Sequence, residues 1–266
     1  MTKNEVKKTF FEVPEVVKDA LPFRIESGNE TLAIITHGFT SSPYHLRHLA
    51  EYLAERGIDV ETILLAGHGS SEQALEKTSH HDWLDSVESV LLKNLDKYKK
   101  IYMIGHSLGA NISICLSVKY PQIKGIVSLG ASIYLRGEFW QRFFLPWYKF
   151  FGIKKLKKMW LKPEEAELII KRGGRTNIPI KSVDQLYKFI DTHTKKEIAQ
   201  ATAPILIVHS RYDKVSHPYS SQFLFENIAS QDKELFILDK SDHGLLQSTR
   251  RDFLFKKIVN FIGNHN

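Results

Sequence analysis

The chain has 266 residues, of which 42% are apolar and 25% are charged, and this composition is typical of a globular protein. No window reaches the roughly 18 uninterrupted apolar residues that a membrane-spanning helix needs. The first eight residues are charged and lack the apolar core of a signal peptide. Cys115 is the single cysteine, so no internal disulfide can form. We therefore expect a cytoplasmic protein that is a monomer or a homodimer.

The net charge of +7 raises the question of nucleic-acid binding. The sequence has no zinc-finger spacing, no aromatic strand of the kind that stacks on RNA bases, and no arginine-rich arm. Much of the excess positive charge lies in one segment, between residues 138 and 160. We expect no nucleic-acid partner.

Strands and helices alternate through the first half of the chain. The apolar runs and helical spacings predict the following elements in order: a strand at 31–36, a helix that opens at Pro43, a strand at 58–64, a helix at 82–98, a strand at 101–106, a helix at 110–119 and a strand at 125–129. This alternation is typical of a parallel sheet covered by helices on both faces. The chain therefore has the pattern of the α/β class.

The alternation stops at about residue 131 and resumes near residue 202. The later elements are a strand at 204–210, a helix at 218–227, a strand at 234–238 and a helix at 247–262. We interpret residues 1–130 and 202–266 as the two parts of one core and residues 131–201 as an inserted, mostly helical cap. The whole is expected to form one structural domain.

The most informative segment is the strand that ends in Gly105-His106-Ser107-Leu108-Gly109. Gly-x-Ser-x-Gly between a strand and a helix is the nucleophile elbow, in which a sharp turn exposes the serine hydroxyl at the tip of the strand. The serine backbone is strained there, and the two glycines give the neighbouring backbone room. Ser107 is thus the candidate nucleophile.

A serine hydroxyl needs a base within hydrogen-bond distance, and that base needs an acid to orient it. Asp213 follows the strand at 204–210 and His243 follows the strand at 234–238, so the order along the chain is serine, acid, histidine. Asp239 and Asp242 are rival acids, but both lie in the same short loop as His243. We predict Ser107, Asp213 and His243 as the catalytic residues.

An acyl-transfer site also needs two N–H donors for the developing oxyanion. The backbone N–H of Leu108 lies directly after the nucleophile at the start of a helix. The loop after the first strand, His37-Gly38-Phe39, is placed to supply the second donor. We predict an oxyanion hole formed by the backbone N–H groups of Phe39 and Leu108.

These segments together resemble the esterases and lipases of the α/β-hydrolase fold, and more narrowly the bacterial carboxylesterases and monoacylglycerol lipases. The segments that carry the resemblance are Thr36-His-Gly-Phe-Thr-Ser-Ser-Pro43, Leu65-Ala-Gly-His-Gly69, Asp82-Trp83, Gly105-His-Ser-Leu-Gly109, Ser210-Arg-Tyr-Asp213 and Ser241-Asp-His-Gly244. The resemblance implies a mostly parallel central sheet, the triad and oxyanion hole named above, an apolar acyl pocket under a cap, and no metal or organic cofactor. His80, His81, His106 and His209 show no spacing typical of a metal site.

The cap segment is more aromatic and more basic than the resemblance implies. Its aromatic residues are Phe139, Trp140, Phe143, Phe144, Trp147, Tyr148, Phe150, Phe151 and Trp160. Its basic residues are Arg142, Lys149, Lys154, Lys155, Lys157 and Lys158. Three interpretations stay open: the aromatic residues pack on the core, they line an acyl channel, or they make a weak contact with an anionic membrane surface.

The sequence thus predicts a serine carboxylic-ester hydrolase that acts on medium to long acyl esters, with monoacylglycerol among them. A thioesterase or a feruloyl-type esterase would use the same triad with a different pocket. A hydrolase-fold binding protein without turnover is the alternative from another class, although such a protein has no need of Ser107, Asp213 and His243 together.

Overall fold

The computed structural model describes residues 7–11, 15–157, 163–239 and 241–265. Within these residues the central sheet has eight strands in the order β1-β2-β4-β3-β5-β6-β9-β10. Their bounds are β1 Lys7–Phe10, β2 Phe23–Glu26, β3 Thr31–Thr36, β4 Asp59–Ile63, β5 Lys100–His106, β6 Ile123–Leu129, β9 Ile205–Ser210 and β10 Lys233–Leu238. From β4 to β10 the neighbouring strands are parallel, and β1 and β2 are added antiparallel at one edge. The predicted α/β-hydrolase fold with a mostly parallel sheet is confirmed.

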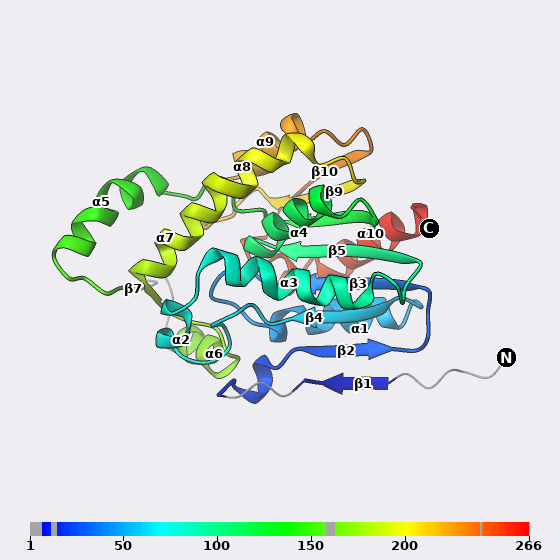
Figure 1. The fold of residues 1–266 in the computed structure, drawn as a ribbon, viewed down its shortest axis with the longest axis horizontal. Helices are drawn as coiled ribbons and strands as arrows, with labels where there is room; N and C mark the ends of the chain where they lie inside the picture. The colour runs from blue at the N-terminus through cyan, green and yellow to red at the C-terminus, as the bar shows by residue number, and fades with distance from the viewer. Residues whose placement is uncertain (1–6, 12–14, 158–162, 240, 266) are drawn as a thin grey trace.

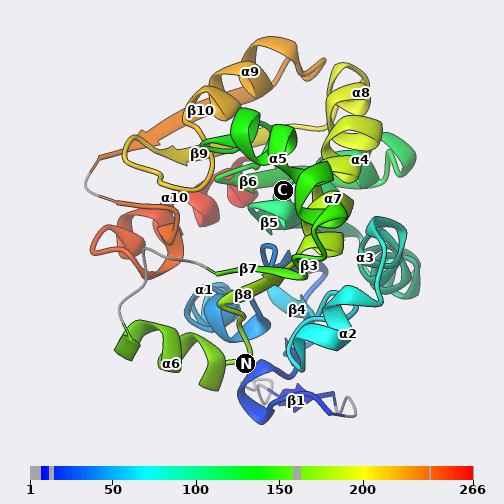
Figure 2. The ribbon, with the colours of Figure 1, turned by 90° about the vertical axis from the view of Figure 1, so that its left-hand side faces the viewer.

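Helices cover both faces of the sheet. One face packs against α1 (Arg47–Ala54) and α10 (Arg251–Asn264), and the other packs against α3 (His80–Asn94), α4 (Leu108–Lys119) and α9 (Tyr219–Asn227). Figure 2 shows α1 and α10 on one side of the strands and α3 and α4 on the other. Because both faces are covered, all six residues of β3 are buried, as expected for a continuous apolar strand in a parallel sheet.

Several boundaries differ from the sequence prediction. Helix α3 begins at His80 and ends at Asn94, whereas the apolar spacing predicted residues 82–98. The reason for the early start is a capping box, in which Ser79 Oγ accepts the Asp82 backbone N–H and the Asp82 carboxylate accepts the Ser79 backbone N–H. The short strands β1 and β2 were not predicted, because four residues give too short a pattern to recognise.

Residues 131–201 lie between β6 and β9 and extend beyond one end of the sheet (Figure 1). They contain α5 Glu138–Phe150, β7 Lys155–Lys157, α6 Pro163–Lys171, β8 Asn177–Pro179, α7 Ile180–Phe189, the π-helical turn η3 Ile190–Thr194, α8 Lys195–Glu197 and the 3₁₀ turn η4 Ile198–Gln200. Strands β7 and β8 pair as a two-stranded antiparallel sheet that was not predicted. The division of the chain into a core and an inserted cap stays a prediction.

Short helical turns complete the described structure. They are η1 Lys18–Ala20, η2 Pro43–Leu46, α2 Glu72–Glu76 and η5 Leu245–Gln247. The predicted helix at Pro43 therefore consists of the 3₁₀ turn η2 followed by α1, and the closing helix starts only at Arg251. None of the helices in the described ranges combines the length and the apolar character that crossing a bilayer requires.

Candidate active site

Ser107 lies at the turn between β5 and α4, at the carboxyl ends of the parallel strands. Its backbone has φ 56° and ψ −117°, a conformation that a residue with a side chain rarely adopts. The turn closes because Gly105 has no side chain: a Cβ there would lie 2.2 Å from the Gly109 carbonyl group. The Ser107 backbone N–H donates to the Leu129 carbonyl oxygen at 2.8 Å, so β6 holds the strained residue in place.

Asp213 and His243 are adjacent in space although they follow different strands. The His243 Nδ1 atom lies 2.7 Å from Asp213 Oδ2. The other carboxylate oxygen, Oδ1, accepts the backbone N–H groups of Val215 and Ser216, each at 2.8 Å. Burial by itself raises the pKa of Asp213, but the hydrogen bond and charge of His243 and the Val215 N–H outweigh it, so the pKa is lowered. Asp213 is therefore an ionised, oriented acceptor for the imidazole.

The two rival acids have other partners. Asp239 forms an exposed ion pair with Arg211 at 2.7 Å, and Asp242 accepts the backbone N–H of Gly244 at 2.8 Å.

A second imidazole, that of His209, lies 3.4 Å from Asp213 Oδ2 and is completely buried. Burial lowers the pKa of His209, so this ring is neutral at pH 7 and supports the carboxylate without adding a charge.

His106, which precedes the nucleophile, binds the loop that carries the candidate base. Its Nε2 atom lies 2.8 Å from the His243 carbonyl oxygen, so this nitrogen carries the proton and donates. Burial and the neighbouring His243 lower the pKa of His106 to about 3. We assigned no role to His106 from the sequence alone. Its position as the second residue of the Gly-x-Ser-x-Gly elbow, next to Ser107, is the sequence feature that could have indicated this contact with the His243 loop.

The loop after β3 places the peptide bond between Gly38 and Phe39 beside Ser107. The buried His37 ring accepts the Leu65 backbone N–H through Nε2 at 3.1 Å, so its Nδ1 atom is protonated and donates to the Gly38 carbonyl oxygen at 2.8 Å. Burial lowers the pKa of His37 well below the ordinary value, which keeps this arrangement neutral. Because the peptide is trans, the Phe39 N–H lies on the side opposite to that carbonyl oxygen.

Leu108 is the first residue of α4, so its backbone N–H has no acceptor within the helix. Phe39 and Ser107 line the same cavity, and Leu108 directly follows Ser107 at the start of α4.

Ser132 is a neighbour of Ser107 that sequence reasoning missed. The Oγ atoms of the two serines lie 2.7 Å apart and share a hydrogen bond. Asn111 of α4 fixes Ser132 in place, because its side chain accepts the Ser132 N–H and donates to the Ser132 carbonyl oxygen. The only signal in the sequence is a small polar residue shortly after a strand that ends at the carboxyl edge.

A cavity of about 190 Å³ opens over Ser107 and His243. Its apolar lining comes from Phe39, Leu46, Leu246 and Ile169, the last from α6. The lining contains no residue of α5, so the described aromatic residues of α5 do not form the walls of this cavity, and their place along a longer acyl channel stays a prediction.

The interpretation that the aromatic residues of α5 pack on the core is also wrong for most of them. Phe139, Trp140, Phe143, Phe144, Trp147, Phe150 and Phe151 are between 39% and 80% exposed. Leu145 is buried and Tyr148 packs partly against the core, so one face of α5 holds the helix and the other faces solvent. Lys158 and Trp160, which belong to the same predicted segment, lie outside the described residues.

The comparison with known families agrees with this geometry. The family model Hydrolase_4, described as "Serine aminopeptidase, S33", matches residues 29–250, which include every residue of the site. The chain belongs to this family.

Its relatives include lipases and esterases. The chain is 29% identical to a thermostable monoacylglycerol lipase of Bacillus sp. (strain H-257), over 94% of this chain and 97% of the relative. It is 26% identical to a carboxylesterase of Bacillus subtilis (strain 168), over 91% of this chain and 95% of the relative. A solved structure from work on two metagenome-derived lipolytic enzymes has a TM-score of 0.82 at 23% identity and covers 94% of this chain and 100% of its own. The predicted resemblance to α/β-hydrolase esterases and lipases is confirmed.

Proposed function

We propose that Ser107, His243 and Asp213 form the catalytic triad of this carboxylic ester hydrolase. The observation that carries the proposal is the 2.7 Å contact between His243 Nδ1 and Asp213 Oδ2, beside a serine in the strained backbone conformation of an elbow. With Nδ1 protonated and bound to the aspartate, the His243 Nε2 lone pair is free to accept a proton. The acid and the base are thus in the states that nucleophilic catalysis needs.

The reaction has two halves. The Ser107 Oγ atom attacks the ester carbonyl carbon while His243 accepts the hydroxyl proton, and the same histidine then protonates the leaving alcohol. Water, deprotonated by His243, next attacks the acyl carbon. The bond from this carbon to Ser107 Oγ then breaks, His243 returns the proton to Oγ, and the carboxylic acid leaves. The Ser107 and Ser132 hydroxyl oxygens lie 2.7 Å apart, and when Ser132 is the donor the Ser107 proton is available to His243.

The backbone N–H groups of Phe39 and Leu108 are proposed to stabilise the tetrahedral oxyanion. The Leu108 N–H comes from a helix terminus, where the dipole also favours negative charge. The bond from His37 to the Gly38 carbonyl oxygen fixes the plane of the peptide that carries the Phe39 N–H. This donor is therefore held in one orientation before the substrate arrives, which avoids reorganisation during the reaction.

The substrates we propose are medium to long acyl esters, with monoacylglycerol among them. The relative from Bacillus sp. (strain H-257) is a monoacylglycerol lipase, and the cavity over Ser107 has the apolar lining that an acyl chain needs. A volume of about 190 Å³ is below the usual range for drug-sized ligands, so a long chain would extend past the cavity.

The test is hydrolysis of nitrophenyl esters from acetate to palmitate and of monoacylglycerol. Ser107→Ala should lower kcat/KM by roughly a thousandfold or more, because the members of a triad act as a unit. Ser89→Ala, which removes an exposed serine on α3, is the matched control and should leave kcat/KM unchanged. A rate that peaks at medium or long chains supports the proposed substrate class, and a peak at acetate contradicts it.

Three further substrates separate the alternatives. Faster turnover of an acyl thioester or a feruloyl ester would replace the proposed substrate by that class. Faster turnover of an aminoacyl nitroanilide would favour the peptidase activity in the description of the family. An absence of turnover by the wild type on all of them would leave a hydrolase-fold binding protein.

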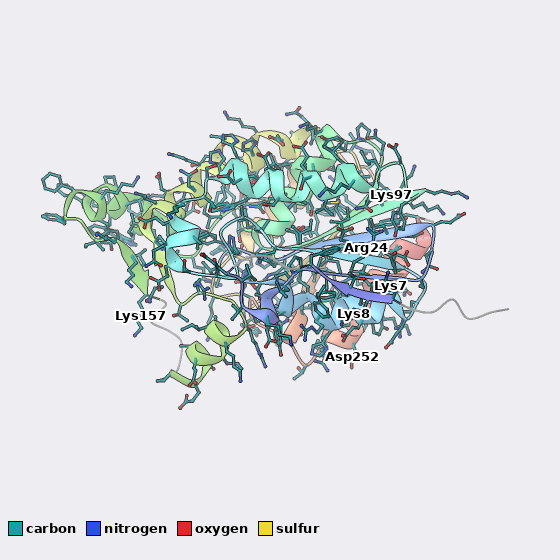
Figure 3. The ribbon with its side chains drawn as sticks, turned by 60° about the horizontal axis from the view of Figure 1, so that its bottom comes forward. Lys7, Lys8, Arg24, Lys97, Lys157 and Asp252 are labelled. Atoms are coloured by element: carbon teal, nitrogen blue, oxygen red, sulfur yellow. The ribbon has the colours of Figure 1, made fainter. Side chains whose placement is uncertain are left out.

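We also propose that the exposed face of α5 contacts anionic membrane surfaces, where lipid esters are found. Seven exposed aromatic side chains on α5 and the residue after it are followed in the chain by the exposed Lys154 and Lys157, and aromatic and basic residues together are what an interfacial helix needs. Figure 3 places Lys157 at the end of the molecule from which α5 projects. A cytoplasmic location and a monomeric or homodimeric state stay predictions.

A further inference from the structure

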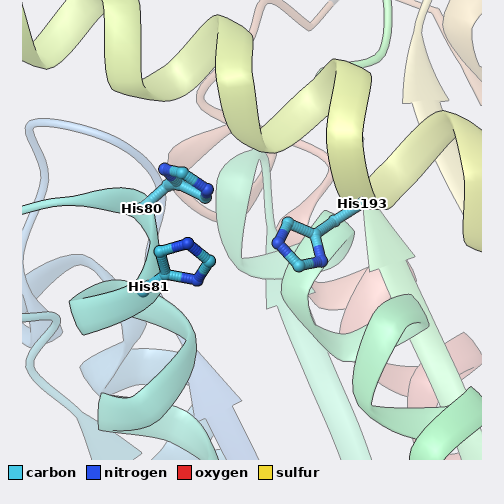
Figure 4. A group of neighbouring side chains, drawn as sticks. All are labelled: His80, His81 and His193. Atoms are coloured by element: carbon cyan, nitrogen blue, oxygen red, sulfur yellow. The ribbon is translucent and has the colours of Figure 1, made fainter.

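Three histidine side chains from two separate segments meet outside the active site. His80 and His81 open helix α3, and His193 lies in the π-helical turn η3 (Figure 4). Each ring offers one nitrogen, and these three nitrogens lie within 4.8 Å of one another. The ring centroids are 4.0 Å apart for His80 and His81 and 5.6 and 5.8 Å from these two to His193.

Two of the rings are oriented by side-chain acceptors behind them. The Gln185 Oε1 atom lies 2.7 Å from His80 Nδ1 and also accepts the His80 backbone N–H, so His80 Nδ1 carries a proton. The Glu197 carboxylate lies 2.9 Å from His193 Nδ1 and binds a proton there in the same way. In both rings Nε2 then keeps the free lone pair. A histidine that binds a metal ion is usually held by such an outer acceptor on its second nitrogen.

The charges around the cluster partly cancel. Lys188 lies near His80 and repels a cation there, whereas the Glu197 carboxylate, 2.9 Å from His193 Nδ1, attracts one.

We propose that His80, His81 and His193 bind one divalent transition-metal ion of the zinc type. Imidazole ligands suit zinc, copper and nickel, and three histidines with an open position for water form a known zinc coordination. In a tetrahedral site with bonds of 2.0–2.1 Å the nitrogens stand about 3.4 Å apart. The observed separation of up to 4.8 Å closes to this value by small rotations of the side chains, and His81, which is exposed, is free to make them.

A metal ion at this position would join two parts of the fold. It would fasten the first turn of α3 to η3, which continues α7, and so reinforce the hydrogen bonds between His80 and Gln185. Helix α3 also carries Trp83, whose ring contacts Phe39 beside the nucleophile. The bound ion would therefore stabilise the wall behind the active site without taking part in the reaction.

The test is zinc binding to the full chain without a polyhistidine tag, after dialysis against a chelator. Isothermal titration should give one Zn²⁺ per chain, and Co²⁺ should develop the visible absorption of a tetrahedral site that Zn²⁺ then removes. Saturating Zn²⁺ should raise the thermal midpoint by several degrees, because a ligand that binds the folded state stabilises it.

The variants decide which residues bind the ion. His193→Gln and His81→Gln should each weaken zinc binding at least tenfold, and His48→Gln, which changes an exposed histidine on α1, should bind as the wild type does. Without zinc, the circular dichroism spectrum and the thermal midpoint of His81→Gln should match those of the wild type, which shows that this variant is folded. A wild type that binds no zinc, or variants that bind it equally well, would overturn the proposal.

Discussion

Buried neutral histidines position groups of the proposed active site. His37 orients the peptide that carries the Phe39 N–H, and His106 holds the backbone of His243. Burial lowers the pKa of both rings, so each remains a neutral donor over the pH range in which an esterase works. A lysine or a protonated histidine at these positions would place an unwanted charge beside the catalytic base.

The lowered pKa of His106 predicts a loss of stability in acid. The unfolded chain binds a proton to this residue near pH 6.5, whereas the folded chain does so only at about pH 3, so the free energy of unfolding falls as the pH drops between these values. His106→Gln keeps an N–H donor and removes the titration. Between pH 7 and pH 5 the wild type should therefore lose more stability than this variant, by at most about 2 kcal/mol. Urea unfolding at the two pH values measures the difference, and equal losses would contradict the prediction.

The junction of β5 and α4 sets the position of the nucleophile through backbone packing. A Cβ on Gly105 would meet the Gly109 backbone, and a Cβ on Gly109 would meet the Thr36 carbonyl oxygen at the end of β3, so neither position has room for a methyl group. The sharp turn between them holds Ser107 at a positive φ of 56°. The crossing of strand and helix therefore requires glycine at both positions.

Gly105→Ala should unfold the protein or destabilise it by about 3 kcal/mol or more, because the atoms that the new methyl group meets belong to the backbone and cannot move aside. Gly263→Ala is the matched control, since Gly263 lies in α10 with nothing within 4 Å of the added Cβ. This control should leave stability unchanged or raise it by up to about 1 kcal/mol. Thermal and urea unfolding of both variants measure the contrast, and a stable Gly105→Ala protein would refute this account of the elbow.

At the scale of the whole molecule, the candidate active site and the exposed aromatic face of α5 lie at the same end of the sheet. The carboxyl ends of β3, β5, β9 and β10 bring together the loops with Phe39, Ser107, Asp213 and His243. Helix α5 and strand β7 lie at this same end, and α5 projects from it with its aromatic face exposed (Figure 1). A lipid surface that binds α5 would therefore lie near the entrance to the active site.

The membrane proposal predicts sedimentation of the protein with phosphatidylcholine vesicles that contain phosphatidylglycerol, and weaker binding to phosphatidylcholine alone or at high salt. Replacing Trp140 and Phe143 together by serine should weaken binding to the vesicles roughly tenfold or more. The reason is that the two aromatic rings, which are transferred from water to the lipid surface on binding, are then absent. Phe253→Ser on α10 is the matched control, since Phe253 is 54% exposed and Phe143 is 55% exposed. Equal binding by the double variant and this control would contradict the proposal.

The sequence by itself determined the fold class and the segments that supply the site. Apolar runs and the Gly-x-Ser-x-Gly elbow are local patterns, and the order Ser107, Asp213, His243 follows from strands that end at one edge of a parallel sheet. The resemblance to known esterases and lipases could be read from those same segments.

Only the tertiary structure decided what depends on contacts between distant segments. It placed Asp213 on the imidazole while Asp239 pairs with Arg211, it brought Ser132 to the nucleophile, and it gathered three histidines from two elements. It also left the aromatic face of α5 exposed, although the amphipathic pattern of that segment fits a buried face equally well. The physical reason is that a sequence pattern gives the period of an element, whereas the partner of each face is set by packing across the whole chain.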